Sequence, residues 1–174
     1  MNESNAKKSH SARVVLKLGN DVSTDAIYPG RFMATVLPSE TPQFAFADLT
    51  EFNAGLKKKE IPAGSVILAG ANFGCGSSRE QAVSTLKGHD LIIIAKGFAR
   101  IFLQNSVNLG LQTVACPDID ASEGDEIEIA GSLVINRTTG RQYAIQPLPP
   151  ARQAIMAAGG LIPYTRHRLI EKRS

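Results

Sequence analysis

Two continuous apolar runs of strand length, each followed by a helical pattern, constrain the fold of this chain most strongly. Ser65–Ala69 leads into a glycine-rich turn and then into a helical stripe that stops at Gly88. Leu91–Ala95 is apolar throughout, as a strand buried on both faces is, and a further helical pattern and the strand Leu111–Ala115 follow it. This order predicts an α/β fold, with a small parallel sheet, right-handed crossovers and flanking helices.

The segments on either side complete the expected fold. Short strand-like pieces between residues 126 and 145, joined by glycine turns, predict an antiparallel meander. We expect residues 1–11 to form a disordered tail and residues 12–174 to form one domain. The other expected elements are a strand at Arg13–Leu18, a short extended piece at Thr24–Tyr28, a helix opening at Thr41–Pro42 with Thr41 as N-cap, and helices at Ala151–Ala158 and Pro163–Ile170.

Composition and charge exclude several classes of protein. No apolar run approaches the ~20 residues of a membrane helix, and the polar N-terminus lacks the apolar core of a signal peptide, so we expect a cytoplasmic protein. The net charge is +3, and the last ten residues alone supply that excess. No nucleic-acid motif accompanies the charge, so we expect neither a nucleic-acid nor a membrane partner.

The richest local motif is the loop Ala71–Ala82, which places Ser77, Ser78 and Arg79 at the start of a helix. One interpretation is structural, since Ser78 and Gln81 fit a capping box beside glycine turns. The functional interpretation rests on Arg79, because a cation at the positive end of a helix dipole is unfavourable unless an anion sits in front of it. A carboxylate is the anion that the guanidinium fork suits best.

Other kinds of site fit the sequence poorly. No lysine follows the glycines as a Walker loop requires, and Arg79 stands where a dinucleotide fingerprint needs its third glycine. The only support left for a phosphate site is the position of the loop at the start of a helix. The three histidines form no ligand pattern, and two cysteines are too few for a four-iron cluster, so we expect no metal in this chain. The loop alone thus lacks a good general base and a metal.

Several separated motifs identify the chain as similar to a known family. Asn72–Glu80 resembles the signature of the aconitase-family swivelling β/β/α domain, and more closely that of the separate small subunits of 3-isopropylmalate dehydratase and archaeal homoaconitase. The segments Asn20–Gly30, Ala95–Phe102, Asn108–Leu111 and Ala157–Leu161 also match in order, so that the resemblance covers nearly the whole chain.

The resemblance implies a hydro-lyase that isomerises a hydroxy-dicarboxylate or hydroxy-tricarboxylate through an enoate. Ser77 would be the catalytic base, Ser78 and Arg79 would hold a substrate carboxylate, and Thr24 and Asp25 would lie beside the substrate. The chain itself would carry no cofactor. A large subunit would hold the [4Fe-4S] cluster and would form a heterodimer or heterotetramer with this chain.

The loop after the Pro29–Gly30 turn would set the substrate, and here it contains Arg31, Phe32, Met33, Ala34 and Thr35. Ala34 stands where the homoaconitase subunits have an arginine that binds an extra carboxylate, so the loop favours an alkyl substituent. Arg31 would replace that arginine only if the loop slipped by one residue or followed a different backbone path. We therefore expect a 3-isopropylmalate dehydratase-type enzyme of leucine biosynthesis. The alternatives are a homoaconitase, a citraconate or dimethylmaleate hydratase, and a non-catalytic carboxylate-binding module.

Overall fold

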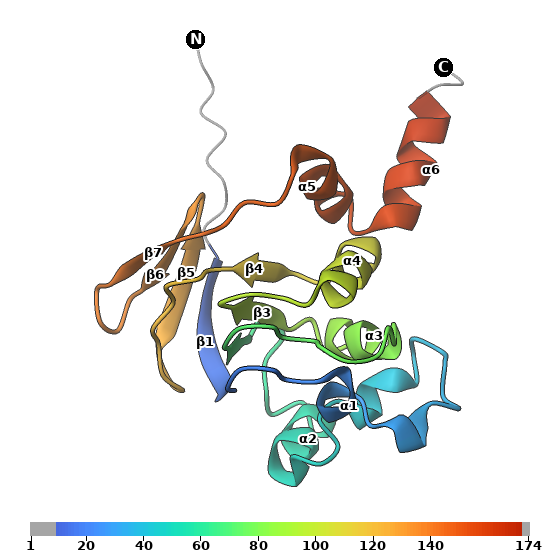
Figure 1. Ribbon diagram of the computed structural model, residues 1–174, viewed down its shortest axis with the longest axis horizontal. Helices are drawn as coiled ribbons and strands as arrows, with labels where there is room; N and C mark the ends of the chain where they lie inside the picture. The colour runs from blue at the N-terminus through green and yellow to red at the C-terminus, as the bar shows by residue number, and fades with distance from the viewer. Residues whose placement is uncertain (1–9, 172–174) are drawn as a thin grey trace.

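The computed structural model describes residues 10–171, whose strands form a single mixed sheet (Figure 1). The strand order is β4-β3-β2-β1-β5-β6-β7. The first four strands along the chain run parallel, and β5 to β7 continue the sheet antiparallel from the other edge of β1. Their bounds are β1 His10–Lys17, β2 Val66–Ala69, β3 Ile92–Ala95, β4 Thr113–Ala115, β5 Glu126–Ala130, β6 Leu133–Asn136 and β7 Gln142–Ala144.

Helices connect the parallel strands and close the C-terminal end of the described chain (Figure 1). α3 and α4 are the crossovers between β2, β3 and β4, while α1 and α2 lie between β1 and β2. The bounds are α1 Thr24–Ile27, α2 Thr50–Lys57, α3 Gln81–Lys87, α4 Arg100–Leu109, α5 Pro150–Ala157 and α6 Leu161–Glu171, with 3-10 turns at Gly30–Phe32 and Thr41–Phe44.

The sheet buries a different apolar cluster on each face, because successive side chains of a strand point to opposite sides. Ile67 and Ile93 pack against the helices, together with the aromatic rings around α1 and α4. Val66 and Leu68 face the other way and pack with Ile127 of β5 and Val134 of β6. The antiparallel half therefore curls over the face that the helices leave uncovered.

β1 joins the two halves of the sheet. Residues 10–13 pair antiparallel with β5, whereas Val14, Leu16 and Lys17 pair parallel with β2. The register with β2 shifts between Val14 and Leu16, just after the strand changes partners. The predicted parallel sheet and the predicted meander are thus one continuous sheet, which confirms the α/β fold class.

Two local predictions were wrong. Thr24–Ile27 is a one-turn helix rather than an extended piece, because Ser23 accepts a hydrogen bond from the Ala26 amide and caps it. Thr41 is not the N-cap of a long helix but lies inside a short 3-10 turn. The backbone of Phe46 is left-handed (φ 48°), which stops any helix there, and α2 then forms where none was predicted.

The tail prediction also needs a correction. β1 begins at His10, so residues 10 and 11 belong to the sheet and not to a tail. Residues 1–9 of the predicted tail lie outside the described part of the chain.

Candidate active site

Two loops that are far apart in sequence meet at the carboxyl ends of β1 and β2. The Asp21 amide donates to Ala71 O (2.9 Å), the Gly74 amide donates to Val22 O (2.8 Å), and the Thr24 amide donates to the Cys75 carbonyl (2.7 Å). Adjacent parallel strands end at the same edge of a sheet, which is where α/β folds usually form their sites. This ladder brings the loop that carries Thr24 and Asp25 against the loop that carries Ser77 and Arg79.

Glycines allow the second loop to turn closely over α4. Gly74 has a left-handed backbone (φ 80°), and a Cβ atom there would lie 2.2 Å from Cγ of the Phe102 ring. Gly76 is left-handed as well (φ 95°). The chain therefore reverses tightly between Phe73, which is fully buried, and the exposed residues Ser77 and Ser78.

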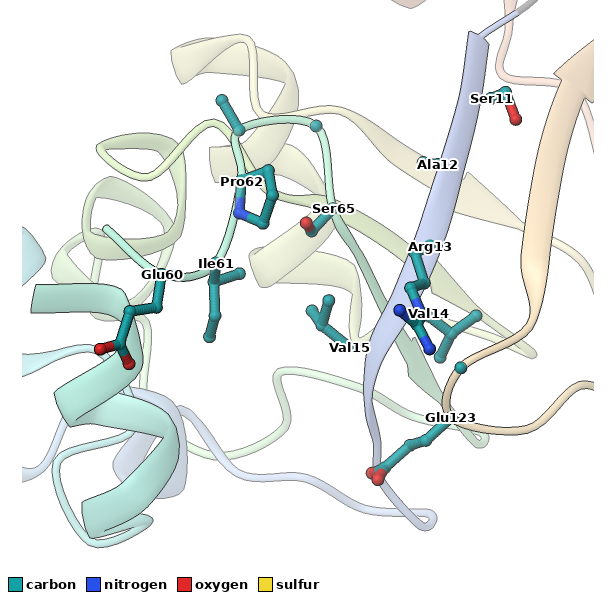
Figure 2. A pocket seen from close by; sticks show the side chains of 13 residues that line it. Ser11, Ala12, Arg13, Val14, Val15, Glu60, Ile61, Pro62, Ser65 and Glu123 are labelled. Carbon is teal, nitrogen blue, oxygen red and sulfur yellow. The ribbon is translucent and has the colours of Figure 1, made fainter. Parts of the chain in front are cut away.

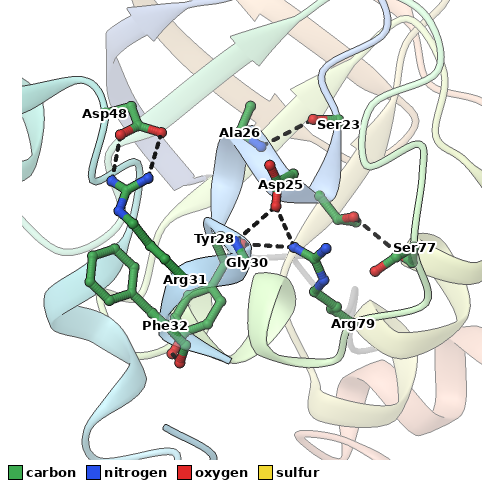
Figure 3. Close-up of polar contacts among 11 residues, drawn as sticks. Ser23, Asp25, Ala26, Tyr28, Gly30, Arg31, Phe32, Asp48, Ser77 and Arg79 are labelled. Atoms are coloured by element: carbon green, nitrogen blue, oxygen red, sulfur yellow. Dashed lines mark hydrogen bonds and ion pairs between the residues drawn. The ribbon is translucent and has the colours of Figure 1, made fainter. Parts of the chain in front are cut away.

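Arg79 forms an ion pair with Asp25 across the two loops (Figure 3). Arg79 Nη1 lies 2.6 Å from Asp25 Oδ1, and the Gly30 amide donates to the same oxygen at 2.8 Å. The Arg79 side chain is 19% exposed and that of Asp25 is 63% exposed, so the carboxylate reaches from solvent to a half-buried cation. The hydrogen bonds from Arg79 and Gly30 lower the pKa of the Asp25 carboxyl, which keeps it ionised.

The predicted capping box is absent from the described residues around α3. The helix begins at Gln81, and its N-cap is Glu80, whose side chain makes no capping bond. Ser78 lies outside the helix and accepts a hydrogen bond on its carbonyl oxygen from Asn105 Nδ2 (3.3 Å). Asp25 is therefore the anion that pairs with the Arg79 cation near the start of α3. The start of the helix contributes little to this pairing.

Ser77 and Ser78 lie on the solvent-exposed part of the loop. Both residues are exposed, and Thr24 Oγ1 donates to the Ser77 carbonyl at 3.2 Å (Figure 3). Within residues 10–171 the two serine hydroxyls make no hydrogen bond, and Arg79 Nε is buried without a partner. The arrangement groups a guanidinium and two free hydroxyls on a surface, which suits the binding of a carboxylate.

The expected specificity loop is fastened at its start. Arg31 pairs with both oxygens of Asp48 and lies over the Phe32 ring, 4.7 Å from its centroid (Figure 3). Phe32 stacks on Phe44 with 4.1 Å between centroids and packs against the helix-side core. Tyr28 Oη lies 3.0 Å from Phe32 O and 3.2 Å from Thr35 O and donates to these carbonyls.

The middle of this loop faces outward. Met33 is 46% exposed and Ala34 is exposed, whereas the ring of Phe32 is half-buried in the core. Phe32 is thus a packing residue as well as a neighbour of the site. Sequence reasoning missed Tyr28 and Gly30 as site-shaping residues, although the Pro29–Gly30 turn signal marked the place.

A separate cavity of about 710 Å³ lies away from these residues, between β1 and the segment 60–65 (Figure 2). Arg13, Glu60 and Glu123 are its charged lining residues. Glu123 Oε1 accepts a hydrogen bond from the Lys17 amide at 2.7 Å, which fastens the end of β1. The cavity contains none of the predicted site residues.

The donor chemistry of the chain does not suit an iron–sulfur cluster. Residues 10–171 contain no group of three His, Cys, Asp or Glu side chains that could hold a metal ion. Cys75 Sγ donates to the Asp21 carbonyl, whereas Cys116 is buried in the core on the other face of the sheet. Two separated thiols cannot supply the ligand set of a four-iron cluster. No helix among the described residues is long and apolar enough to cross a bilayer.

Comparison with known proteins gives consistent matches. The family described as the aconitase C-terminal domain matches residues 39–118. The 3-isopropylmalate dehydratase small subunit of Methanosarcina mazei is 42% identical over 161 residues, covering 90% of this chain and 96% of that protein. The isopropylmalate/citramalate isomerase small subunit of Methanocaldococcus jannaschii is 42% identical over 164 residues, which are 91% of this chain and 95% of that protein.

A solved structure also matches the whole fold. The crystal structure of 3-isopropylmalate dehydratase from Methanocaldococcus jannaschii has a TM-score of 0.85 and 36% sequence identity to this chain. The match covers 95% of this chain and 99% of the other.

Proposed function

The chain belongs to the family of 3-isopropylmalate dehydratase small subunits, and we propose that it completes a hydro-lyase that interconverts 2-isopropylmalate and 3-isopropylmalate in leucine biosynthesis. The observation that carries this proposal is the Ser77–Ser78–Arg79 loop held against Asp25, in a chain 42% identical to such a subunit over 90% of its length. The reaction would take place in the cytoplasm. It would remove and re-add water across one carbon–carbon bond.

Ser77 is the proposed base. A serine hydroxyl is a weak base at neutral pH and needs a neighbouring positive charge to stabilise its alkoxide. Arg79 is the cation in the same loop, and the Ser77 hydroxyl makes no hydrogen bond within residues 10–171 that would compete for it. In this scheme the alkoxide removes a proton from the carbon next to a substrate carboxylate during dehydration. The Ser77 hydroxyl then returns a proton to carbon when water is added back.

Arg79 and Ser78 are the proposed carboxylate clamp, and Asp25 positions the cation. The ion pair engages Arg79 Nη1, whereas Nη2 makes no hydrogen bond within residues 10–171. A substrate carboxylate can approach that second nitrogen and the Ser78 hydroxyl. Asp25 and Thr24 then act through the orientation of Arg79 and the Ser77 backbone.

The specificity loop favours a substrate with an alkyl substituent. Homoaconitate would bring a further carboxylate, and an unpaired charge in a closed site costs several kcal/mol. Ala34 has no group to pair with it, and Arg31 is already engaged by Asp48. Met33 and Ala34 are apolar and accessible, as an isopropyl or methyl group requires.

A methyl-substituted substrate is the second candidate. The Methanocaldococcus jannaschii relative is named for both isopropylmalate and citramalate. A shorter alkyl group would meet the same exposed apolar side chains, so citraconate hydration is expected alongside isopropylmaleate hydration in one enzyme.

The catalytic metal is proposed to reside in the partner. A large subunit with a [4Fe-4S] cluster would bind and activate the substrate hydroxyl, and this chain would supply the base and the carboxylate clamp. We expect a heteromer of the two subunits, and we expect the isolated chain to be inactive.

The test is reconstitution with the large subunit under anaerobic conditions. Hydration rates of isopropylmaleate, citraconate, dimethylmaleate and homoaconitate are compared in the same preparation. We expect isopropylmaleate to be preferred and Ser77→Ala to lose turnover while the subunits still associate. Ser132→Ala, at an exposed serine of the β5–β6 turn, is the control and should keep full activity.

Each alternative has its own signature in this experiment. Preference for homoaconitate would contradict the interpretation of Ala34 and Arg31. Full activity of Ser77→Ala would remove the proposed base. An inactive complex that still binds isopropylmalate would favour the non-catalytic carboxylate-binding module.

A further inference from the structure

α6 is held firmly at its start and projects from the body of the molecule (Figure 1). It packs against α4 and α5, and backbone contacts at glycines make the junction tight. A Cβ atom on Gly160 would lie 2.6 Å from Asn108 O, and one on Gly110 would lie 2.5 Å from Gly159 O. Only glycines allow this approach, so the direction of α6 is set by the fold and its outward face is a fixed surface.

The outward face carries an apolar stripe. Leu161, Ile162 and Leu169 are 41%, 73% and 57% exposed. With Thr165, Arg166 and Ile170 they line one shallow surface hollow, which we call the α6 stripe. Pro163 and Tyr164, on the other side of the helix, are half-buried. More apolar side chains of α6 therefore point outward than pack inward.

Within residues 161–171, the charged side chains in and beside the α6 stripe are arginines. Arg166 lies within the stripe, and Arg168 flanks it, because each residue of a helix turns by ~100°. Glu171, the acid of α6, falls on the opposite side by the same geometry. An occupant of this surface must bury leucine and isoleucine side chains and bring carboxylates beside them.

α4 contacts both the serine loop of the candidate active site and the start of α6. Asn105 of α4 donates to the Ser78 carbonyl, and Ile101, one turn earlier, is 41% exposed. The far end of α4, at Asn108, contacts Gly160 at the start of α6. α4 has ten residues, a length of about 15 Å, so one partner can span from the serine loop to α6.

We infer that the α6 stripe is a docking surface for the large subunit, which meets it with an apolar groove bordered by acidic side chains. This inference rests on the proposed function, because the partner that completes the serine loop is the one that extends along α4. A second copy of the chain fits less well. Pairing two α6 helices antiparallel would bring Arg166, near the middle of the stripe, close to its counterpart and would leave the α4 surface uncovered.

The experiment titrates the full chain into the purified, cluster-loaded large subunit, with the dissociation constant read from calorimetry and from reconstituted activity. Leu169→Asp and Ile162→Asp are expected to weaken binding at least tenfold. Leu169→Met, the matched control, is expected to stay within twofold of wild type. Arg166→Glu with Arg168→Glu should also weaken binding, and added salt should weaken the wild type more than this double variant.

Turnover separates docking from catalysis. At saturating concentrations of Leu169→Asp the activity per complex should equal that of wild type, because the residue is remote from the serine loop. Unchanged melting temperatures of the isolated variants check that they fold. Equal affinity of wild type, Leu169→Asp and Ile162→Asp overturns the inference. So does a self-association of the isolated chain that Leu169→Asp abolishes without changing its affinity for the large subunit. A tight wild-type complex that hydrates none of the substrates refutes the proposed function and leaves the docking surface standing.

Discussion

The contact between Gly74 and the Phe102 ring makes a quantitative prediction about the active-site loop. Gly74→Ala places a Cβ atom 2.2 Å from the ring and forces a left-handed backbone on an alanine. The left-handed conformation costs ~1–2 kcal/mol for a residue with a Cβ atom. Displacing a buried ring in a packed core costs a further ~1–3 kcal/mol. The expected destabilisation is the sum, about 2–5 kcal/mol.

Two other glycines separate these contributions. Gly131 is left-handed (φ 62°), but a Cβ atom there would meet nothing within 4 Å, so Gly131→Ala should cost only the backbone component. Gly19 is not left-handed and also has open space around its Cβ position. Gly19→Ala should therefore be neutral or slightly stabilising, through the lower entropy of the unfolded chain.

Thermal unfolding and urea titration of the three variants give the comparison. For a chain of this size ~1 kcal/mol shifts the melting temperature by about 2–4 °C, so Gly74→Ala should melt about 4–20 °C below wild type. Activity of the reconstituted complex should fall more than the folded fraction does, because the displaced loop carries Ser77. Equal destabilisation in Gly74→Ala and Gly131→Ala would refute the role assigned to the Phe102 contact.

Three further predictions concern charge, thiol chemistry and a buried amide. The pKa of Asp25 lies below its ordinary 3.8, so the stabilisation from its pair with Arg79 is present above pH 3.8 and is lost as the pH falls below that value. Asp25→Asn should therefore reduce stability at neutral pH but not at the acid end, as measured by urea titration at several pH values. Burial raises the pKa of the Cys116 thiol to about 11, so iodoacetamide should label Cys75 first in the native protein. Peptide mass mapping would measure this, and equal labelling of the two thiols would contradict the burial of Cys116. Asn53 donates to two backbone carbonyls from a buried position, so Asn53→Ala should lower the free energy of unfolding by ~1–3 kcal/mol, measured by urea unfolding. A loss under about 0.5 kcal/mol would show that these hydrogen bonds are dispensable.

The parallel core was predictable because its signals are local and strong. Runs such as Ile92–Ala95 are apolar on both faces, and Gly88 marks the end of the helix before them. The sequence did not reveal that β1 joins the two halves, because its pairing with β5 connects residues more than a hundred positions apart. Register over such distances depends on packing and not on local pattern.

The region between β1 and β2 was predicted least well, for reasons that are visible in the backbone. Thr24–Ile27 is too short for helical periodicity to appear, and its cap, Ser23, decides the conformation. The apolar spacing after Thr41 resembles a helix, but Phe46 adopts a left-handed backbone that divides the segment. Amphipathic spacing indicates which side chains are buried and does not reveal such a break.

The candidate site was predicted by residue but not by geometry. Ser77, Ser78 and Arg79 are recognisable from their motif, and the need of Arg79 for an anion follows from charge alone. That the chain itself supplies this anion, from Asp25, required the structure, because the pair spans 54 residues. The roles of these residues in catalysis stay predictions until the reconstituted complex is measured.

The placement of β1 has a consequence for how the protein is made. Among the described residues, β1 is the first strand to leave the ribosome, yet its two neighbours, β2 and β5, emerge only after about fifty and more than a hundred further residues. β1 can therefore pair with β2 early, but its β5 side stays unpaired until more than a hundred further residues have been made. β5 to β7, by contrast, are joined by short turns and can form as soon as they appear. Joining of the two halves of the sheet is thus delayed until β5 has emerged, whereas the β1–β2 edge that carries both site loops can form earlier.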